Sequence, residues 1–246
     1  MSFDQTVNTD GPIPGETVRH GTGVNSTRAF PTEGYPHNLD PFVLFERFYI
    51  EPDDGFPTHP HKGFEIVSYM LDGGMEHGDS LGVSHTAYEG DAMHIVAGGG
   101  IEHSEMPADG ASCNGLQLWV NLPREKKEMD ASYADADADE LPTHEVEGAT
   151  ITTVVGEGSP LSTVTEITYE DVRVDGMWEW TAPEGWSGFL FGVEGEGAVD
   201  GEAFGTGDVL PVSEAGGTTV EGELRLVAVA GEPYGQPIQQ RGPFVF

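Results

Sequence analysis

Two short patterns in this 246-residue chain carry side chains that can bind a metal ion, His59-Pro60-His61 and His103-Ser104-Glu105. In a β-strand, residues i and i+2 point to the same face, so each pair can project into one interior. If the two strands are neighbours, all four side chains converge. Three neutral imidazoles and one carboxylate suit a divalent Fe, Mn, Co, Ni, Cu or Zn ion. An octahedral ion held in this way keeps two positions for a small molecule or O₂.

The remaining titratable side chains give weaker signals. Glu65 lies four residues beyond His61, and we expect it on the same strand face, either as a ligand or as an acid beside the ligands. We favour the second role, because Glu105 fills the carboxylate place. We interpret His77 as a loop residue or part of the pocket mouth, His94 as a core or supporting residue, Cys113 as a small buried residue, and His20, His37, His85 and His144 as surface residues.

Glycine and proline, at 35 and 17 residues, divide the chain into short runs of β-forming residues. Examples are FEIVSYML at 64–71, AMHIVA at 92–97 and LQLWVNL at 116–122, each closed by glycine or proline. This spacing is typical of a sandwich or a barrel. Helical periodicity is weak, and its best candidate is the charged stretch 124–140.

The acidic segment 124–147 predicts an exposed linker with one helical turn, and an acidic docking segment is the alternative interpretation. The two flanking halves resemble each other. Segment 67–77 aligns with 189–199 without gaps, and 88–100 aligns with 205–217. We therefore expect two copies of one small β-barrel, at residues 1–135 and 136–246.

Extending this alignment places non-histidine residues at the metal positions of the second copy. Thr181 and Pro183 fall opposite His59 and His61, while Glu221 and Glu223 fall opposite His103 and Glu105. All nine histidines lie at or before His144. A metal site is therefore expected in the first copy only.

Charge excludes several classes of partner. Ten Lys and Arg residues against 43 Asp and Glu residues give a net charge of −33. Such a field repels nucleic acid and anionic membrane surfaces. With no apolar run long enough to cross a membrane and no leader pattern in the first ten residues, we expect a soluble cytoplasmic protein. The acidity indicates a salt-loving microbial source.

Longer runs around the two metal-binding patterns resemble the pirin family. They are GFPTHPHKGFEIVSYMLDGGMEHGDSLG at 55–82, AGGGIEHSEMP at 97–107 and GLQLWVNLP at 115–123, with flanking similarity at 39–48 and 231–246. The resemblance implies an all-β bicupin, in which two tandem cupin (jelly-roll-like) barrels are stacked. It also implies one metal ion, usually Fe(II), in the N-terminal barrel, with His59, His61, His103 and Glu105 as its ligands.

The resemblance leaves three functions open. The first is O₂-dependent oxidation of a chelating small molecule, of the quercetin 2,3-dioxygenase type, with Glu105 or Glu65 taking the substrate proton. The second is a non-enzymatic iron or redox sensor that acts through a protein partner. The third is a structural bicupin whose metal braces the barrel. In each case we expect a monomer.

Overall fold

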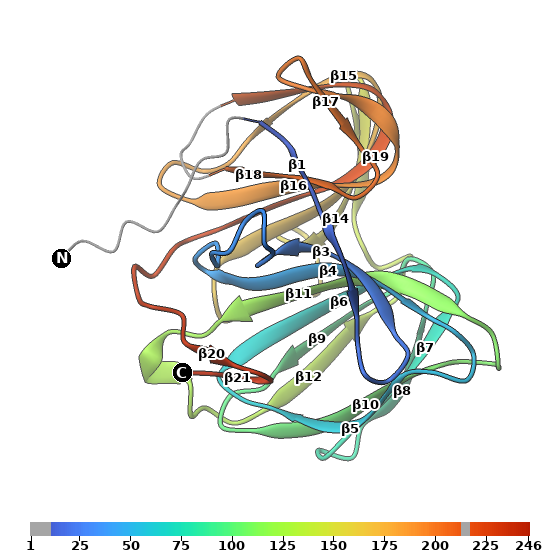
Figure 1. Cartoon of the computed structure of the whole chain (residues 1–246), viewed down its shortest axis with the longest axis vertical. Helices are drawn as coiled ribbons and strands as arrows, with labels where there is room; N and C mark the ends of the chain where they lie inside the picture. The colour runs from blue at the N-terminus through green and yellow to red at the C-terminus, as the bar shows by residue number, and fades with distance from the viewer. Residues whose placement is uncertain (1–10, 213–216) are drawn as a thin grey trace.

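The computed structural model describes residues 11–212 and 217–246, and almost all of its regular structure is β-strand (Figure 1). A 3₁₀ turn at Arg124–Lys126 is the one helical element of the part described. The strands are β1 Ile13–Pro14, β2 Glu16–Arg19, β3 Asn25–Phe30, β4 Phe42–Ile50, β5 Phe56–His61, β6 Phe64–Asp72, β7 Gly74–Asp79, β8 Ser84–Tyr88, β9 Ala92–Val96, β10 Ile101–Pro107, β11 Cys113–Asn121, β12 Ser132–Ala136, β13 Thr143–Val146, β14 Ala149–Val155, β15 Ile167–Thr181, β16 Ser187–Val199, β17 Glu202–Gly205, β18 Asp208–Val212, β19 Gly217–Gly231, β20 Gln240–Arg241 and β21 Phe244–Val245.

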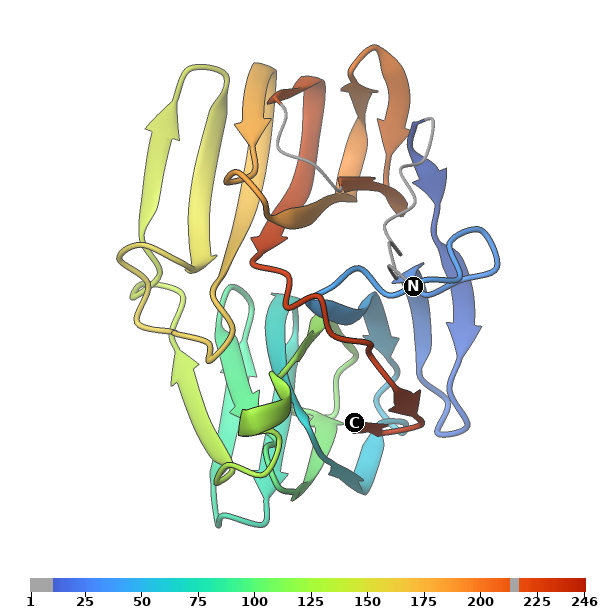
Figure 2. The ribbon, with the colours of Figure 1, turned by 90° about the vertical axis from the view of Figure 1, so that its left-hand side faces the viewer.

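Two β-barrels stack on each other, as the side-on view shows (Figure 2). The first barrel combines a seven-stranded sheet, ordered β12-β9-β6-β11-β4-β3-β2, with a four-stranded sheet, ordered β5-β10-β7-β8. The second is built from one eight-stranded sheet, ordered β1-β18-β16-β19-β15-β14-β13, with β17 paired to β16. The predicted pair of barrels is therefore confirmed.

Side chains alternate between two faces along the central strands of the first barrel. One face packs into the core between the two barrels, and the other face lines the inside of the first barrel. In β11, Leu116, Leu118 and Val120 face the second barrel and join the large core between the barrels. The intervening Gln117 and Trp119 point to the opposite face and line a pocket inside the first barrel. This is the two-residue period of a strand, and it lets one segment serve both a core and a site.

Aromatic side chains bind the two barrels together. Phe45 of β4 packs against Phe189 and Phe191 of β16, with ring centroids 4.8 and 5.1 Å apart. All three rings are fully buried. Burying one such ring contributes about 1.5–3 kcal/mol, so this contact holds the barrels as one unit.

The two ends of the described chain cross over to the opposite barrel. β1 pairs with β18 of the second barrel, with Ile13 opposite Val209. The tail that carries β20 and β21 runs back along the first barrel (Figure 2). There the Val245 amide donates to the carbonyl of Lys62 at 3.0 Å, and the Val245 side chain is buried. Domains at 1–135 and 136–246 stay a prediction; β1 belongs to the sheet of the second barrel, and the C-terminal tail packs against the first barrel.

The segment 124–147 is more ordered than the linker that its composition predicts. Its 3₁₀ turn matches the single helical turn allowed for it, but β12 pairs with β9 and β13 pairs with β14. The linker interpretation is wrong for these strands, because β12 completes the edge of the seven-stranded sheet and β13 completes the edge of the eight-stranded sheet. Its acidic side chains at 135, 137, 139 and 140 stay exposed.

No helix in residues 11–212 or 217–246 has the length and hydropathy that a membrane crossing requires. The polar first ten residues, on which the expectation of no leader rests, lie outside the described part of the chain. Cytoplasmic location and the monomeric state stay predictions.

Candidate metal centre

Strand pairing brings the two metal-binding patterns together. β5 and β10 are antiparallel neighbours, and His59 lies directly opposite His103. The register shifts between His103 and Glu105, so Glu105 pairs with Phe56. Despite this bulge, His103 and Glu105 are both buried, at 1% and 2% exposed, while Ser104 between them is half-buried. Both side chains therefore face the barrel interior.

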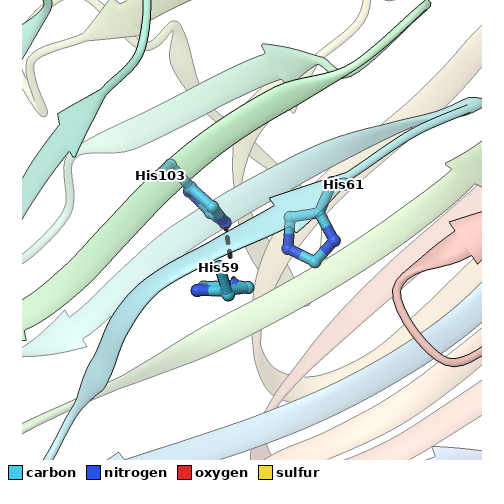
Figure 3. Close-up of side chains that lie close together, drawn as sticks. All are labelled: His59, His61 and His103. Atoms are coloured by element: carbon cyan, nitrogen blue, oxygen red, sulfur yellow. Dashed lines mark hydrogen bonds between the residues drawn. The ribbon is translucent and has the colours of Figure 1, made fainter.

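The imidazoles of His59, His61 and His103 converge on one point (Figure 3). One ring nitrogen from each lies within 4.8 Å of the other two. The Nε2 atoms of His59 and His103 are 3.1 Å apart. Two nitrogens bound at right angles to one ion, at ~2.1 Å each, would be about 3.0 Å apart. The spacing of these imidazoles fits a divalent transition-metal ion.

Backbone carbonyls orient two of the three rings. Nδ1 of His59 lies 2.9 Å from the Pro57 oxygen, and Nδ1 of His61 lies 3.4 Å from the Pro243 oxygen. A carbonyl can only accept, so each Nδ1 carries the proton and each Nε2 keeps a free lone pair. Metal-binding histidines are usually oriented in this way. Nδ1 of His103 is buried without a partner among the described residues.

Burial keeps two of these imidazoles, those of His61 and His103, neutral. It lowers the pKa of His61 to about 3, assisted by the neighbouring His103 and His59. Burial also lowers the pKa of His103 to about 3, with further contributions from His59 and His77. Metal ligation requires the neutral imidazole, so the rings of His61 and His103 are in the ligating form at neutral pH.

A hydrogen-bonded relay fixes Glu105 on the wall beside the imidazoles. Trp119 Nε1 donates to Gln117 Oε1 at 3.0 Å, and Gln117 Nε2 donates to Glu105 Oε2 at 3.2 Å. This order assigns the Gln117 amide and turns its donor toward the carboxylate. The cluster of ligand atoms within 4.8 Å contains the three imidazoles, and Glu105 lies outside it. Glu105 does line the same pocket as His59 and His61.

That pocket has a volume of about 340 Å³. Its apolar walls are Leu44, Phe56, Trp119 and Pro243, and its polar walls include Gln117, Glu105 and the imidazoles. Gln240, Gly242 and Pro243 reach it from the tail. An apolar cavity with a few convergent polar groups is the usual form of a small-molecule site.

Glu65 does not lie beside the imidazoles, so the expectation that placed it on their strand face is wrong. Lys62 and Gly63 end β5 and reverse the chain, so Glu65 sits on β6 in the other sheet, opposite Val96. Its carboxylate accepts from the amides of Val164 and Thr165 at 2.7 and 3.0 Å. It also lies 2.9 Å from His94 Nε2. Glu65 ties the second barrel to the first, and it is absent from the residues that line the pocket.

Two histidines are more buried than the sequence indicates. His77 lies in strand β7, not in a loop, and is 2% exposed. Its ring stacks on Tyr133 at 4.7 Å and lies 5.6 Å from that of His103. His20, interpreted as a surface residue, lines the metal pocket and contacts Glu46. Isolated histidines carry no spacing signal, so only strand pairing shows these contacts. His94 and Cys113 are buried as predicted.

The observed strand pairing corrects the residues that were predicted to occupy the metal-ligand positions in the second barrel. Val199 aligns with His77, and the partner of His77 on β10 is Glu105. The partner of Val199 on β19 is Val220, so Val220 takes the place of Glu105. The predicted equivalence with Glu223 is therefore wrong by three residues.

The predicted equivalents of His59 and His103 also shift, by one and by three residues. His59 and His103 correspond to the facing pair Trp180 and Thr218, in place of Thr181 and Glu221. Trp178, Trp180 and Val220 belong to the apolar core of the second barrel. Among the described residues, the cluster of metal-binding side chains occurs in the first barrel alone.

Comparison with family models matches the pirin model to residues 23–120 and the pirin C-terminal cupin domain to residues 169–246. The chain belongs to the pirin family. Its two barrels are therefore the two cupin domains of a bicupin, as the resemblance implies. A putative pirin-like protein of Arabidopsis thaliana is 37% identical to it, over 89% of this chain and 86% of that protein. A putative quercetin 2,3-dioxygenase of Pseudomonas aeruginosa is 36% identical, over 94% and 88%.

Solved structures show the same pirin fold. A quercetin 2,3-dioxygenase from Acinetobacter baumannii superposes with a TM-score of 0.87 at 24% identity, covering 97% of this chain and 91% of that one. A bacterial pirin from Escherichia coli in complex with nickel(II) superposes with a TM-score of 0.73 at 22% identity, covering 89% and 95%.

Proposed function

We propose that this pirin is a mononuclear metal enzyme that oxidises a chelating small molecule with O₂, in the manner of a quercetin 2,3-dioxygenase. The observation that carries the proposal is the group of three converging imidazoles beside a partly apolar pocket with Glu105 on its wall. The similarity to a putative quercetin 2,3-dioxygenase supports the reaction type.

We assign His59, His61, His103 and Glu105 as the ligands and Fe(II) as the native metal. When bound there, the ion supplies a Lewis acid for the substrate oxygens and a place for O₂. A related pirin binds nickel(II), which makes nickel the second metal to test.

The residues of the chain perform three tasks in this proposal. The carbonyls of Pro57 and Pro243 orient the imidazoles, as described above. Phe56, Leu44 and Trp119 exclude water from one side of the pocket. Glu105, oriented by the Gln117 amide, accepts the proton of a substrate hydroxyl.

The test measures metal content and O₂ uptake with quercetin on protein loaded separately with Fe(II) and Ni(II). We expect about one ion per chain and uptake in at least one metal form. His61→Gln should lose both, whereas the exposed His144→Gln should keep both. Stoichiometric metal without O₂ uptake in either form would reject the enzyme and favour the sensor with a protein partner.

A further inference from the structure

A partly buried cluster of charged side chains forms a second polar end of the metal pocket. Glu46 of β4 is 3% exposed, and its Oε2 accepts from Nε and Nη2 of Arg28 at 3.0 and 2.8 Å. Its Oε1 lies 3.0 Å from His20 Nε2 and accepts from Ser26 Oγ at 3.2 Å. Arg28, Glu46 and His20 all line the pocket.

Glu46 has no capacity left for a ligand. Its two oxygens already make four contacts, which is the number of lone pairs that a carboxylate offers. Burial alone would raise its pKa, but His20 and Arg28 outweigh burial and hold the pKa below its usual value. Glu46 therefore stays ionised and fixes the positions of Arg28 and His20.

Arg28 keeps donors to spare. A guanidinium has five N–H groups, and the contacts with Glu46 use Nε and one side of Nη2. Within the described residues, Nη1 of Arg28 donates to no acceptor. Arg28 lines the pocket, so its remaining N–H groups can donate to an anionic oxygen of a ligand bound there.

One aromatic ring separates the two polar ends. The Phe56 ring lies edge-on to His20, with centroids 5.3 Å apart, and its centroid is 5.9 Å from that of His59. Trp119 provides a second aromatic wall and packs against His61 at 5.1 Å. A flat body of about one ring can therefore lie along Phe56 and reach both ends.

We propose that the native ligand is a single-ring or similarly short planar chelator that bears a carboxylate opposite its two metal-binding oxygens. Arg28 binds this carboxylate and determines specificity, while Glu46 and His20 are positioning residues. This inference rests on the proposed function, because it assumes that the chelating oxygens bind at the three imidazoles.

The experiment compares two probes, 3,4-dihydroxybenzoate and catechol, which differ by one carboxylate. Dissociation constants are measured by calorimetry on the full chain loaded with Ni(II). We expect dihydroxybenzoate to bind at least tenfold more tightly than catechol. Arg28→Gln should abolish this preference and change the catechol constant less than twofold. Arg19→Gln, on the exposed face of β2, is the matched control and should change neither constant.

Further variants keep the test decisive if Arg28→Gln leaves Glu46 unpaired and unfolds the protein. The double variant Arg28→Gln/Glu46→Gln removes both charges, and Arg28→Lys should restore part of the preference. Equal affinity of the wild-type protein for both probes, or a preference that survives loss of Arg28, would overturn the inference alone. Two results would overturn the proposed function and the inference together. The first is a wild-type protein that does not retain nickel, and the second is one that binds catechol equally well with and without the metal.

Discussion

Nδ1 of His61 lies 3.4 Å from the carbonyl oxygen of Pro243, which is 182 residues further along the chain. The tail that supplies this carbonyl is held at its far side by Lys127, whose Nζ donates to Gly63 O at 2.8 Å and reaches Val245 O at 3.5 Å. Gly63 has a φ of +84°, and a Cβ there would collide with the Val245 carbonyl. The first-barrel metal site therefore depends on a segment that follows the second barrel.

Detaching this tail should weaken metal binding. Val245→Asp places a charge in the apolar site where Val245 is 1% exposed, whereas Phe246→Asp places the same charge on a residue that is 51% exposed. We expect Val245→Asp to lower nickel affinity about tenfold, the usual effect of losing a group that orients a ligand. Competition with a chelator measures the change. Equal affinities of the two variants would show that the tail does not orient His61.

Glu65→Gln should destabilise the fold without removing the metal. The carboxylate is fully buried and accepts from the amides of Val164 and Thr165, so the variant turns an amide donor toward at least one of them. Breaking a buried charged contact of this kind costs about 3–5 kcal/mol. Urea unfolding measures the loss, with the exposed Glu89→Gln as control. Unchanged stability together with lost O₂ uptake would instead return Glu65 to the catalytic role first expected.

Cys113 should be unreactive in the folded protein. Its side chain is 1% exposed, and burial, followed by the fields of Glu105 and Asp72, raises the pKa of its thiol to about 11. This pKa lies above the value of about 8.5 for an unfolded thiol. The protonated thiol therefore makes its full contribution to the free energy of unfolding below about pH 8.5. The contribution is lost as the pH rises toward about 11. A chromogenic disulfide reagent at pH 8 should label Cys113 only when denaturant unfolds the protein. Complete labelling of the native protein within seconds would contradict its buried position.

Salt should stabilise the fold. The net charge of −33 makes the surface carboxylates repel one another, and molar salt reduces the screening length to about 3 Å. We expect the melting temperature to rise between dilute buffer and molar potassium chloride. A melting curve that does not change with salt would remove the basis for a salt-loving source.

Period-two patterns carried most of what could be predicted. His59-Pro60-His61 predicted two imidazoles on one face, and neighbouring strands then placed His103 opposite His59. The β-forming runs closed by glycine and proline, together with the similarity of the two halves, predicted the barrels. Most of these features depend on residues that are close together in the chain, so composition and residue spacing are enough to predict them.

Register and long-range packing could not be predicted from the same patterns. A strand slip of three residues separates the predicted Glu223 from the observed Val220, because bulges change the count without leaving a sequence signal. Glu65 differs from its expected position because Gly63 reverses the chain before β6. The burial of His20 and His77 depends on partners that are distant in sequence, and a single residue gives no warning of them.

The exchange of chain ends also has a kinetic consequence. β1 cannot find its partner β18 until about 200 residues have left the ribosome, and the wall at Pro243 emerges later still. Loops this long close slowly, because entropy opposes every distant pairing. A nascent chain therefore exposes its histidines before the pocket around them is finished, and under the proposed function we expect metal binding to follow the docking of the tail.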